Sequence, residues 1–146
     1  MNVFSDLETL TEYKKFFKNL SEEIKILAIY FSENEREELL KEVDFEDKTV
    51  SSVGIETMLQ RQIEEDESGV TIGYDLIGIE ISGDFHTFHC HNLAGELEEK
   101  FSVKINEFGL IEDCSNWKEL VEFMNDEETG CEPFPWFLVK VKRFNT

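Results

Sequence analysis

Hydrophobic positions recur at helical spacing over several stretches of the chain. Leu7, Leu10, Tyr13, Phe17 and Leu20 follow one another at intervals of three or four residues, and this spacing predicts an amphipathic helix. Three further apolar stripes also predict helices, and a fourth, narrower stripe predicts a short helix with mostly solvated faces. The helices are expected within roughly 5–20, 55–63, 85–101 and from 115 onward, and the solvated helix within 32–47.

Two other stretches have the compact apolar runs that are typical of buried strands. Residues 24–31 are apolar apart from Lys25 and rich in β-branched and aromatic residues, which predicts a strand buried on both faces. Residues 70–81 predict a second strand. Gly73 and Gly78 lie inside it, and glycine within a strand indicates a bulge or a close approach of another backbone.

The last strand pattern, 136–144, differs because charge alternates with apolar residues. Phe137, Val139 and Val141 alternate with Leu138, Lys140 and Lys142, which predicts a half-buried strand. Lysines on a strand oppose unwanted strand pairing at an open edge. The pattern therefore predicts a position near an edge of the sheet.

Length and composition favour one folded domain. The chain has 146 residues, 40% of them hydrophobic, with 13 Phe, 2 Trp and 3 Tyr. A chain of this size can bury a sizeable core, and its aromatic content argues against a disordered acidic tail. The two prolines, Pro133 and Pro135, lie near the C-terminus and mark no interdomain linker. We therefore expect a single acidic α+β domain over 1–146, a mainly antiparallel sheet with three or four packed helices.

Negative charge is the dominant feature of the composition. The chain has 33 Asp and Glu against 14 Lys and Arg, a net charge of −19. Such a surface repels nucleic acid and anionic membranes and attracts basic proteins. A general demand for solubility, or a saline environment, would also explain it without a partner. No secretory signal, no stretch of ~20 apolar residues and an odd number of cysteines favour a cytoplasmic protein.

One short segment concentrates the residues that bind metals. His86, His89, Cys90 and His91 lie within six residues, and histidine and cysteine are the usual ligands of zinc. The segment lacks an HExxH or CxxC motif and a fourth ligand elsewhere, so a semi-buried helix start is the better explanation of it. We expect no metal and no cofactor, and a small metal-dependent hydrolase built on this cluster stays an alternative.

No other pattern points to catalysis. The sequence contains neither a GxSxG nucleophile elbow nor a phosphate-binding Walker loop. Adjacent side chains such as His89 and Cys90 point in different directions and seldom form a nucleophile–base pair. We therefore expect a binding protein, not an enzyme, with no catalytic residues.

Three acidic segments, 33–47, 64–67 and 126–132, are candidate partner-binding surfaces, although a solvated face explains each of them too. The 126–136 loop is the first choice because its acids stand beside two prolines and a tryptophan, and an aromatic anchor ringed by charge is typical of an interface hot spot. That tryptophan could instead be a core residue that closes the sheet. The candidate partner-binding residues are Asp126, Glu127, Glu128, Glu132 and Trp136, together with Glu64, Glu65, Asp66 and Glu67.

The C-terminal half also resembles a known class of proteins. The matching motifs are Gly73-Tyr74-Asp75-Leu76-Ile77-Gly78, Phe85-His86 with Cys90 before a helix, Asn106-Glu107-Phe108-Gly109-Leu110-Ile111, and Asn125-Asp126-Glu127-Glu128-Thr129-Gly130-Cys131-Glu132-Pro133 with Trp136. Over about residues 73–137 this arrangement resembles small acidic bacterial immunity proteins of polymorphic or contact-dependent growth inhibition toxin systems. His89 and His91 depart from the pattern.

The resemblance implies a cytoplasmic inhibitor that binds a cognate toxin domain, often a basic nuclease, and blocks its active site. It implies no catalytic residues. Together with the charge, it leads us to expect an immunity protein whose partner is a basic toxin domain rather than nucleic acid or a membrane. A regulatory module or nucleic-acid mimic that occupies a basic groove is a further alternative.

Overall fold

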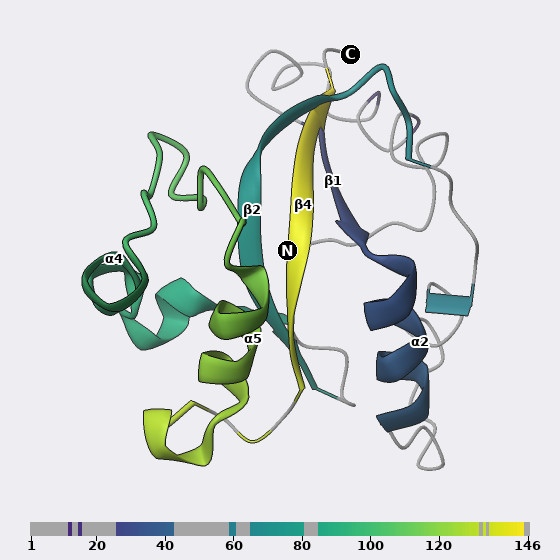
Figure 1. Ribbon diagram of the computed structural model, residues 1–146. Helices are drawn as coiled ribbons and strands as arrows, with labels where there is room; N and C mark the ends of the chain where they lie inside the picture. Colours follow the sequence, from purple (N-terminus) through teal and green to yellow (C-terminus); the bar gives the residue numbers. More distant parts are fainter. Residues whose placement is uncertain are drawn as a thin grey trace.

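The fold is built on one four-stranded sheet with the strand order β1-β4-β2-β3. A computed structural model describes residues 12, 15, 26–42, 59–60, 65–80, 85–131, 133 and 135–144. The strands are β1 (Ile26–Phe31), β2 (Val70–Ile79), β3 (Phe85–Thr87) and β4 (Trp136–Phe144). Each neighbouring pair runs antiparallel, which confirms the expected α+β class with an antiparallel sheet (Figure 1).

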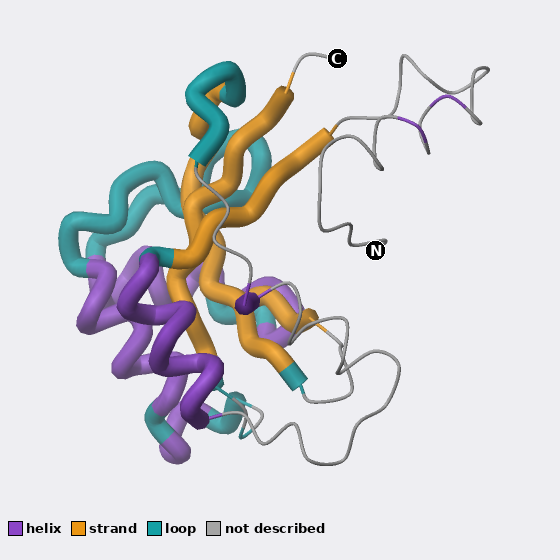
Figure 2. Tube along the Cα trace, turned by 90° about the vertical axis from the view of Figure 1, so that its right-hand side faces the viewer, coloured by secondary structure: helices purple, strands orange, loops and turns teal. Residues whose placement is uncertain are grey.

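Helices cover both sides of this sheet. Among the described residues, the α-helices with defined bounds are α2 (Glu33–Glu42), α4 (Ala94–Phe101) and α5 (Trp117–Asn125), and the short 3-10 helices are η2 (Phe88–His91) and η3 (Glu127–Thr129). In Figure 1, α4 and α5 lie on one side of the strands and α2 on the other, and Figure 2 shows the twisted strands from the side of α2.

Some of the expected helices lie mostly outside the described residues. Of the stretch predicted over 5–20, only Glu12 and Lys15 are described, and both are helical. Of the stretch 55–63, only Leu59 and Gln60 are described, and they are helical as well.

Two apolar clusters form because side chains alternate across the strands. Phe137, Val139 and Val141 of β4 face one cluster, while Trp136 and Leu138 face the other. The first cluster also contains Leu59, Ile77 and Ile79, with Leu40 of α2 packed against it. The second contains Leu76, Phe88, Leu93, Leu97, Val103, Ile111, Leu120 and Met124.

The predicted edge position of β4 is wrong. β4 lies in the middle of the sheet, between β1 and β2, and Lys142 is only 3% exposed. A buried ammonium needs a nearby opposite charge or hydrogen-bond acceptors. The structure provides both from a distant part of the chain, so these lysines are tolerated in a central strand.

The predicted burial of β1 on both faces is also wrong. β1 is the outermost strand on its side of the sheet, and Leu27 near its start is 51% exposed. Leu27 pairs with Arg143 at the end of β4, whereas Ile29 pairs with the buried Val141. Further along β1, Ile29 and Phe31 pack against the first apolar cluster, as Leu40 of α2 does.

Gly73 produces the bulge that the sequence predicted in β2. The register shifts by one residue between Thr71 and Gly73, and Gly73 has a φ of +147°. A Cβ atom there would lie 2.6 Å from Cβ of Leu110, so the turn that follows α4 approaches the strand too closely for any side chain. No such shift occurs at Gly78, which pairs in register with Trp136 and His86.

The start of α2 explains why an acid in a charged segment is buried. The Ser32 hydroxyl donates a hydrogen bond to the Glu35 carboxylate, and its Oγ accepts one from the Glu35 amide, which is an N-cap contact at the start of the helix. The second oxygen of Glu35 accepts from the amide of Leu138 at 3.4 Å. Glu35 thus satisfies a β4 amide at the point where β1 has ended.

The segment 85–101, within which a helix is predicted, does not begin as a helix. It starts with strand β3, which pairs with the end of β2, and continues through η2 into α4. Of the apolar stripe expected to be buried, Phe88, Leu93 and Leu97 are buried, whereas Phe101 is only partly buried against the second cluster.

Candidate functional site

The acids of the 126–136 loop lie on the surface in a fixed local geometry. Asp126, Glu127 and Glu128 are exposed, and η3 contains the two glutamates. The Asp126 carboxylate accepts from the Glu128 amide at 2.9 Å, and the Thr129 hydroxyl donates to the Asp126 carbonyl at 2.7 Å. The Glu127 and Glu128 carboxylates therefore project from an ordered turn. Glu132 lies outside the described residues.

Trp136 is a core residue in the structure, which is the alternative that the sequence left open. It is 1% exposed, and its ring packs edge-on against His91 with 5.7 Å between centroids. Its amide donates to Oδ1 of Asn125 at 2.9 Å, and its carbonyl accepts from Nδ2 at 3.0 Å. Asn125 thus ties the end of α5 to the start of β4, and the indole ring lies beneath the acidic loop, out of reach of a partner.

The exposed acids continue from this loop onto the two neighbouring helices. α4 and α5 are side by side, since the rings of Phe101 and Phe123 are 5.2 Å apart and Lys100 lies 4.7 Å from the Phe123 ring. Seven exposed acids that form no ion pair within the described residues make up what we call the acidic face: Glu98, Glu99, Glu119, Glu122, Asp126, Glu127 and Glu128.

Few cations interrupt this region. Between residues 94 and 129 the chain has eleven acids and three lysines. Two of those lysines are paired, Lys100 with Glu96 at 2.6 Å and Lys104 with Glu112 at 3.5 Å. The remaining acids are exposed to solvent, so their negative potentials add over the surface.

Trp117 is the aromatic residue that the sequence analysis missed on this surface. Its spacing from Leu120 and Met124 fits the apolar stripe of α5, and the sequence therefore assigned it to the core. In the structure its side chain is 36% exposed, with the Lys118 ammonium 5.5 Å from the ring. Trp117 is the first residue of α5, where the stripe runs past the edge of the core.

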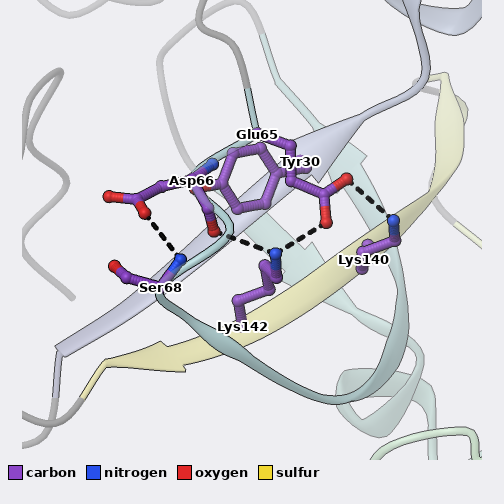
Figure 3. A network of polar contacts seen from close by, with 6 residues as sticks. All are labelled: Tyr30, Glu65, Asp66, Ser68, Lys140 and Lys142. Atoms are coloured by element: carbon purple, nitrogen blue, oxygen red, sulfur yellow. Dashed lines mark hydrogen bonds and ion pairs between the residues drawn. The ribbon is translucent and has the colours of Figure 1, made fainter.

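The described residues of the second acidic segment, 64–67, mainly form ion pairs and hydrogen bonds within the protein (Figure 3). The Glu65 carboxylate forms ion pairs of 2.8 Å with both Lys140 and Lys142. Lys142 also donates to the Asp66 carbonyl at 2.9 Å, and the Asp66 amide donates to the Tyr30 hydroxyl at 3.4 Å. These contacts fix the segment before β2 over β4 and β1.

This network changes the charge balance of the segment. The hydrogen bonds from Lys140 and Lys142 lower the pKa of Glu65 below its usual 4.5, and the hydrogen bonds from Ser68 lower the pKa of Asp66. Glu65 is neutralised by two cations, so it adds little to the attraction of a basic partner. Glu67 is exposed, and Glu64 lies outside the described residues.

Replacing Glu65 with glutamine is expected to lower the thermal stability of the protein between about pH 5 and pH 10. The stabilisation from Glu65, whose pKa is lowered, is present above pH 4.5 and disappears as the pH falls through the lowered value. The stabilisation from Lys140 and Lys142, whose pKa values are raised by Glu65, disappears as the pH rises through the raised values. Thermal unfolding from pH 3 to pH 8 measures the difference.

The matched control for this change is Glu67→Gln, which removes the same charge two residues away at an exposed side chain. We expect a clearly smaller loss of melting temperature for Glu67→Gln at neutral pH. The Glu65→Gln difference should shrink as the pH falls below 4.5. Equal losses for both variants, or a difference that grows as the pH falls below 4.5, would contradict the role given to the ion pairs.

The histidine cluster is divided among separate partners. His86 contacts Glu80, with 3.0 Å between Nε2 and Oε1. Nε2 of His89 is 2.6 Å from the Gly109 carbonyl, and His91 packs on Trp136, while Cys90 is exposed. Among the described residues, no three or more His, Cys, Asp or Glu side chains are grouped so as to hold a metal ion.

One further acid, the partly buried Asp75, stands out because of one of its carboxyl oxygens. Oδ1 of Asp75 on β2 is shielded from solvent and accepts no hydrogen bond within the described part of the chain. Burial raises the pKa of Asp75 from 3.8 to about 7, although the nearby His89 and the Leu76 amide act in the opposite direction. An acid that titrates near neutrality is a candidate for a functional or regulatory role.

Comparison of the chain with protein-family models, with curated proteins and with solved structures gave no match. Within the described residues, no helix has both the length and the apolar character needed to span a membrane.

Proposed function

We propose that this protein is a cytoplasmic immunity protein that binds a cognate basic toxin domain, a nuclease being the expected kind, and blocks the toxin's active site. The observation that carries the proposal is the acidic face over α4, α5 and η3, whose seven carboxylates form no ion pairs within the described residues. Its chemistry complements a groove that is lined by lysine and arginine, such as a nuclease uses to hold its substrate.

The acidic face supports rapid and selective association more than tight binding. Complementary charge steers the encounter and raises the association rate well above that of a neutral pair, and it suppresses binding to other acidic surfaces. Affinity arises mainly from a few buried contacts near the centre of an interface. Trp117 supplies an exposed aromatic side chain of the kind that forms such contacts, and Lys118 beside it is available for a carboxylate on the partner.

Blocking an active site in this way requires no chemistry from the inhibitor. The acidic turn at η3 projects carboxylates from a backbone that is already fixed by hydrogen bonds, so little conformational entropy is lost when it binds. The internal pairing of Glu65 favours this side of the molecule over the 64–67 segment as the contact surface.

Co-expression with the C-terminal domain that the gene immediately upstream encodes tests the proposal. We expect that the protein restores growth of cells that express the toxin domain and that the two proteins co-purify at moderate salt. Cells that stay inhibited although both proteins are made, or a failure to co-purify, would overturn the proposed function.

Charge reversal on the acidic face tests its role in association. The double variant Glu127→Lys/Glu128→Lys is expected to slow association with the toxin domain by about tenfold or more at low salt and to flatten the salt dependence of the rate. The matched control Glu37→Lys/Glu38→Lys makes the same change at exposed positions of α2, on the other side of the sheet. Stopped-flow association at several salt concentrations distinguishes them. An equal effect of both variants would show that overall charge, rather than this face, governs the encounter.

A further inference from the structure

The outer side of β2 is held to the turn 106–110 by a small set of polar contacts. Tyr74 and Ile111 exchange both backbone hydrogen bonds, at 2.9 and 2.8 Å. Nδ2 of Asn106 donates to the Ile72 carbonyl at 2.7 Å, and Oδ1 of Asn106 accepts from the amides of Phe108 and Leu110 at 3.0 and 3.1 Å. These bonds fix the turn against the bulge at Gly73.

His89 links the same turn to η2. Its Nε2 lies 2.6 Å from the carbonyl oxygen of Gly109, and because a carbonyl only accepts hydrogen bonds, this nitrogen carries a hydrogen in the contact. Gly109 has a φ of +73°, and a Cβ there would approach Nε2 of His89 to 3.2 Å. The turn therefore fits closely against the imidazole ring.

Asp75 lies next to this junction, one residue beyond Tyr74 on β2. Across the sheet it pairs with Val139 of β4, which is completely buried and offers no polar group. Of the elements around it, β2 provides the Leu76 amide and η2 provides His89, the titratable group that influences Asp75 electrostatically. Its buried Oδ1 accepts no hydrogen bond within the described residues.

We propose that Asp75 is a pH-responsive latch: the junction of β2 with the turn 106–110 and η2 is closed when Asp75 carries its proton and opens locally when that proton is lost. The protonated carboxyl is neutral, so its burial against β4 costs little. The carboxylate has too few donors around it, and the charged form of a buried group is strongly destabilised unless water or a cation reaches it. Detaching the turn and η2 from β2 admits water to the carboxylate without disrupting the rest of the sheet.

The direction of the response follows from proton linkage. Burial places the pKa of Asp75 at about 7 in the closed state, and a hydrated carboxyl titrates near its ordinary value of about 4. Between about pH 4 and pH 7 the closed state binds more protons than the open state, so opening is favoured by up to about tenfold for each unit of pH, and it levels off above about pH 7. Below pH 4 both states are protonated and the latch has no pH dependence.

Hydrogen exchange followed by mass spectrometry between pH 5 and pH 8 tests the proposal on the intact protein. After correction for intrinsic exchange rates, peptides with the amides of Tyr74, Asn106 and Ile111 are expected to lose at least tenfold in protection over this range. Peptides from the β1–β4 pairing serve as the internal reference. Asp75→Asn should abolish the change, whereas Glu107→Gln, an exposed acid in the same turn, should retain it.

A second variant distinguishes this local opening from a general loss of protection as the pH rises. In His89→Gln the amide can still donate to Gly109, but the electrostatic influence that lowers the pKa of Asp75 is gone, so the rise in opening should continue to a higher pH than in the unmodified protein before it levels off. A pH response that survives in Asp75→Asn, or one equally large in the β1–β4 peptides, would overturn the latch. If the rise in opening levels off at the same pH in His89→Gln as in the unmodified protein, the role assigned to His89 is overturned.

Discussion

Asp75→Asn is expected to increase the free energy of unfolding at pH 8 by up to about 4 kcal/mol, because a rise in pKa from 3.8 to about 7 corresponds to that destabilisation when the acid is ionised. Asparagine has nearly the same shape as aspartic acid and remains neutral at every pH in this range. The substitution therefore removes the need to bury or hydrate a charge at this position of β2.

The sign of the effect distinguishes Asp75 from the other carboxylates discussed above. The folded protein holds the Asp75 proton between about pH 4 and pH 7, while the unfolded chain releases it. Stability of the unmodified protein therefore falls as the pH rises from the unfolded pKa to the folded pKa, and it falls no further above that. The advantage of Asp75→Asn should grow over the same interval and stay constant above about pH 7.

Urea unfolding at pH 4, 6 and 8 measures this difference directly. Asp113→Asn is the matched control, because Asp113 is exposed and removal of its charge leaves its Oδ1 able to accept from the Ser115 amide. An Asp75→Asn variant that is less stable than the unmodified protein at pH 8 would mean that its carboxylate is solvated or paired in the folded state.

The fold class could be predicted from the sequence because it depends on local periodicity. The strand patterns at 24–31, 70–81 and 136–144 correspond to β1, β2 and β4, and Gly73 marked the bulge in β2 correctly. Periodicity reports which residues share a face of a strand, but it does not report which strands are neighbours. The positions of β1 and β4 in the sheet were wrong for that reason.

Lys140 and Lys142 show the physical limit most clearly. Alternating lysines at a strand end are usual at an exposed edge, and the sequence contains no local sign of their partner. Glu65 lies 75 and 77 positions earlier in the chain, within an acidic run that looks like solvated surface. Only the tertiary fold brings its carboxylate within 2.8 Å of both ammonium groups.

The candidate site, too, could be predicted only in part from the sequence, because part of it depends on the tertiary fold. The exposed acids at 126–128 follow from composition alone, since charged residues in a turn remain in water. The sequence did not reveal which of the two tryptophans is exposed. Trp117 fits the apolar stripe of α5, and Trp136 stands beside acids and prolines, yet the structure buries Trp136 and exposes Trp117. Burial depends on where a helix or strand ends relative to the core, which neighbouring residues do not reveal.

The contrast between the two tryptophans leads to the second large expected effect. Trp136→Ala is expected to destabilise the protein by about 3–5 kcal/mol, the usual loss when a large aromatic side chain is removed from a packed core. The ring of Trp136 is 1% exposed and lies among Leu138, Leu120 and Met124 in the second apolar cluster, so its loss leaves a cavity beneath the acidic loop. Urea unfolding measures the change.

Trp117→Ala should show the opposite behaviour. Its side chain is 36% exposed, so we expect a loss of stability of about 1 kcal/mol or less, as at most surface positions.

If Trp117 anchors the toxin domain, its removal should weaken binding by about 2 kcal/mol or more, roughly thirtyfold in Kd. Phe108→Ala, at an aromatic residue that is 48% exposed but lies outside the acidic face, is the control for binding. Equal binding by Trp117→Ala and the unmodified protein would remove Trp117 from the interface. An unchanged free energy of unfolding in Trp136→Ala would contradict its place in the core.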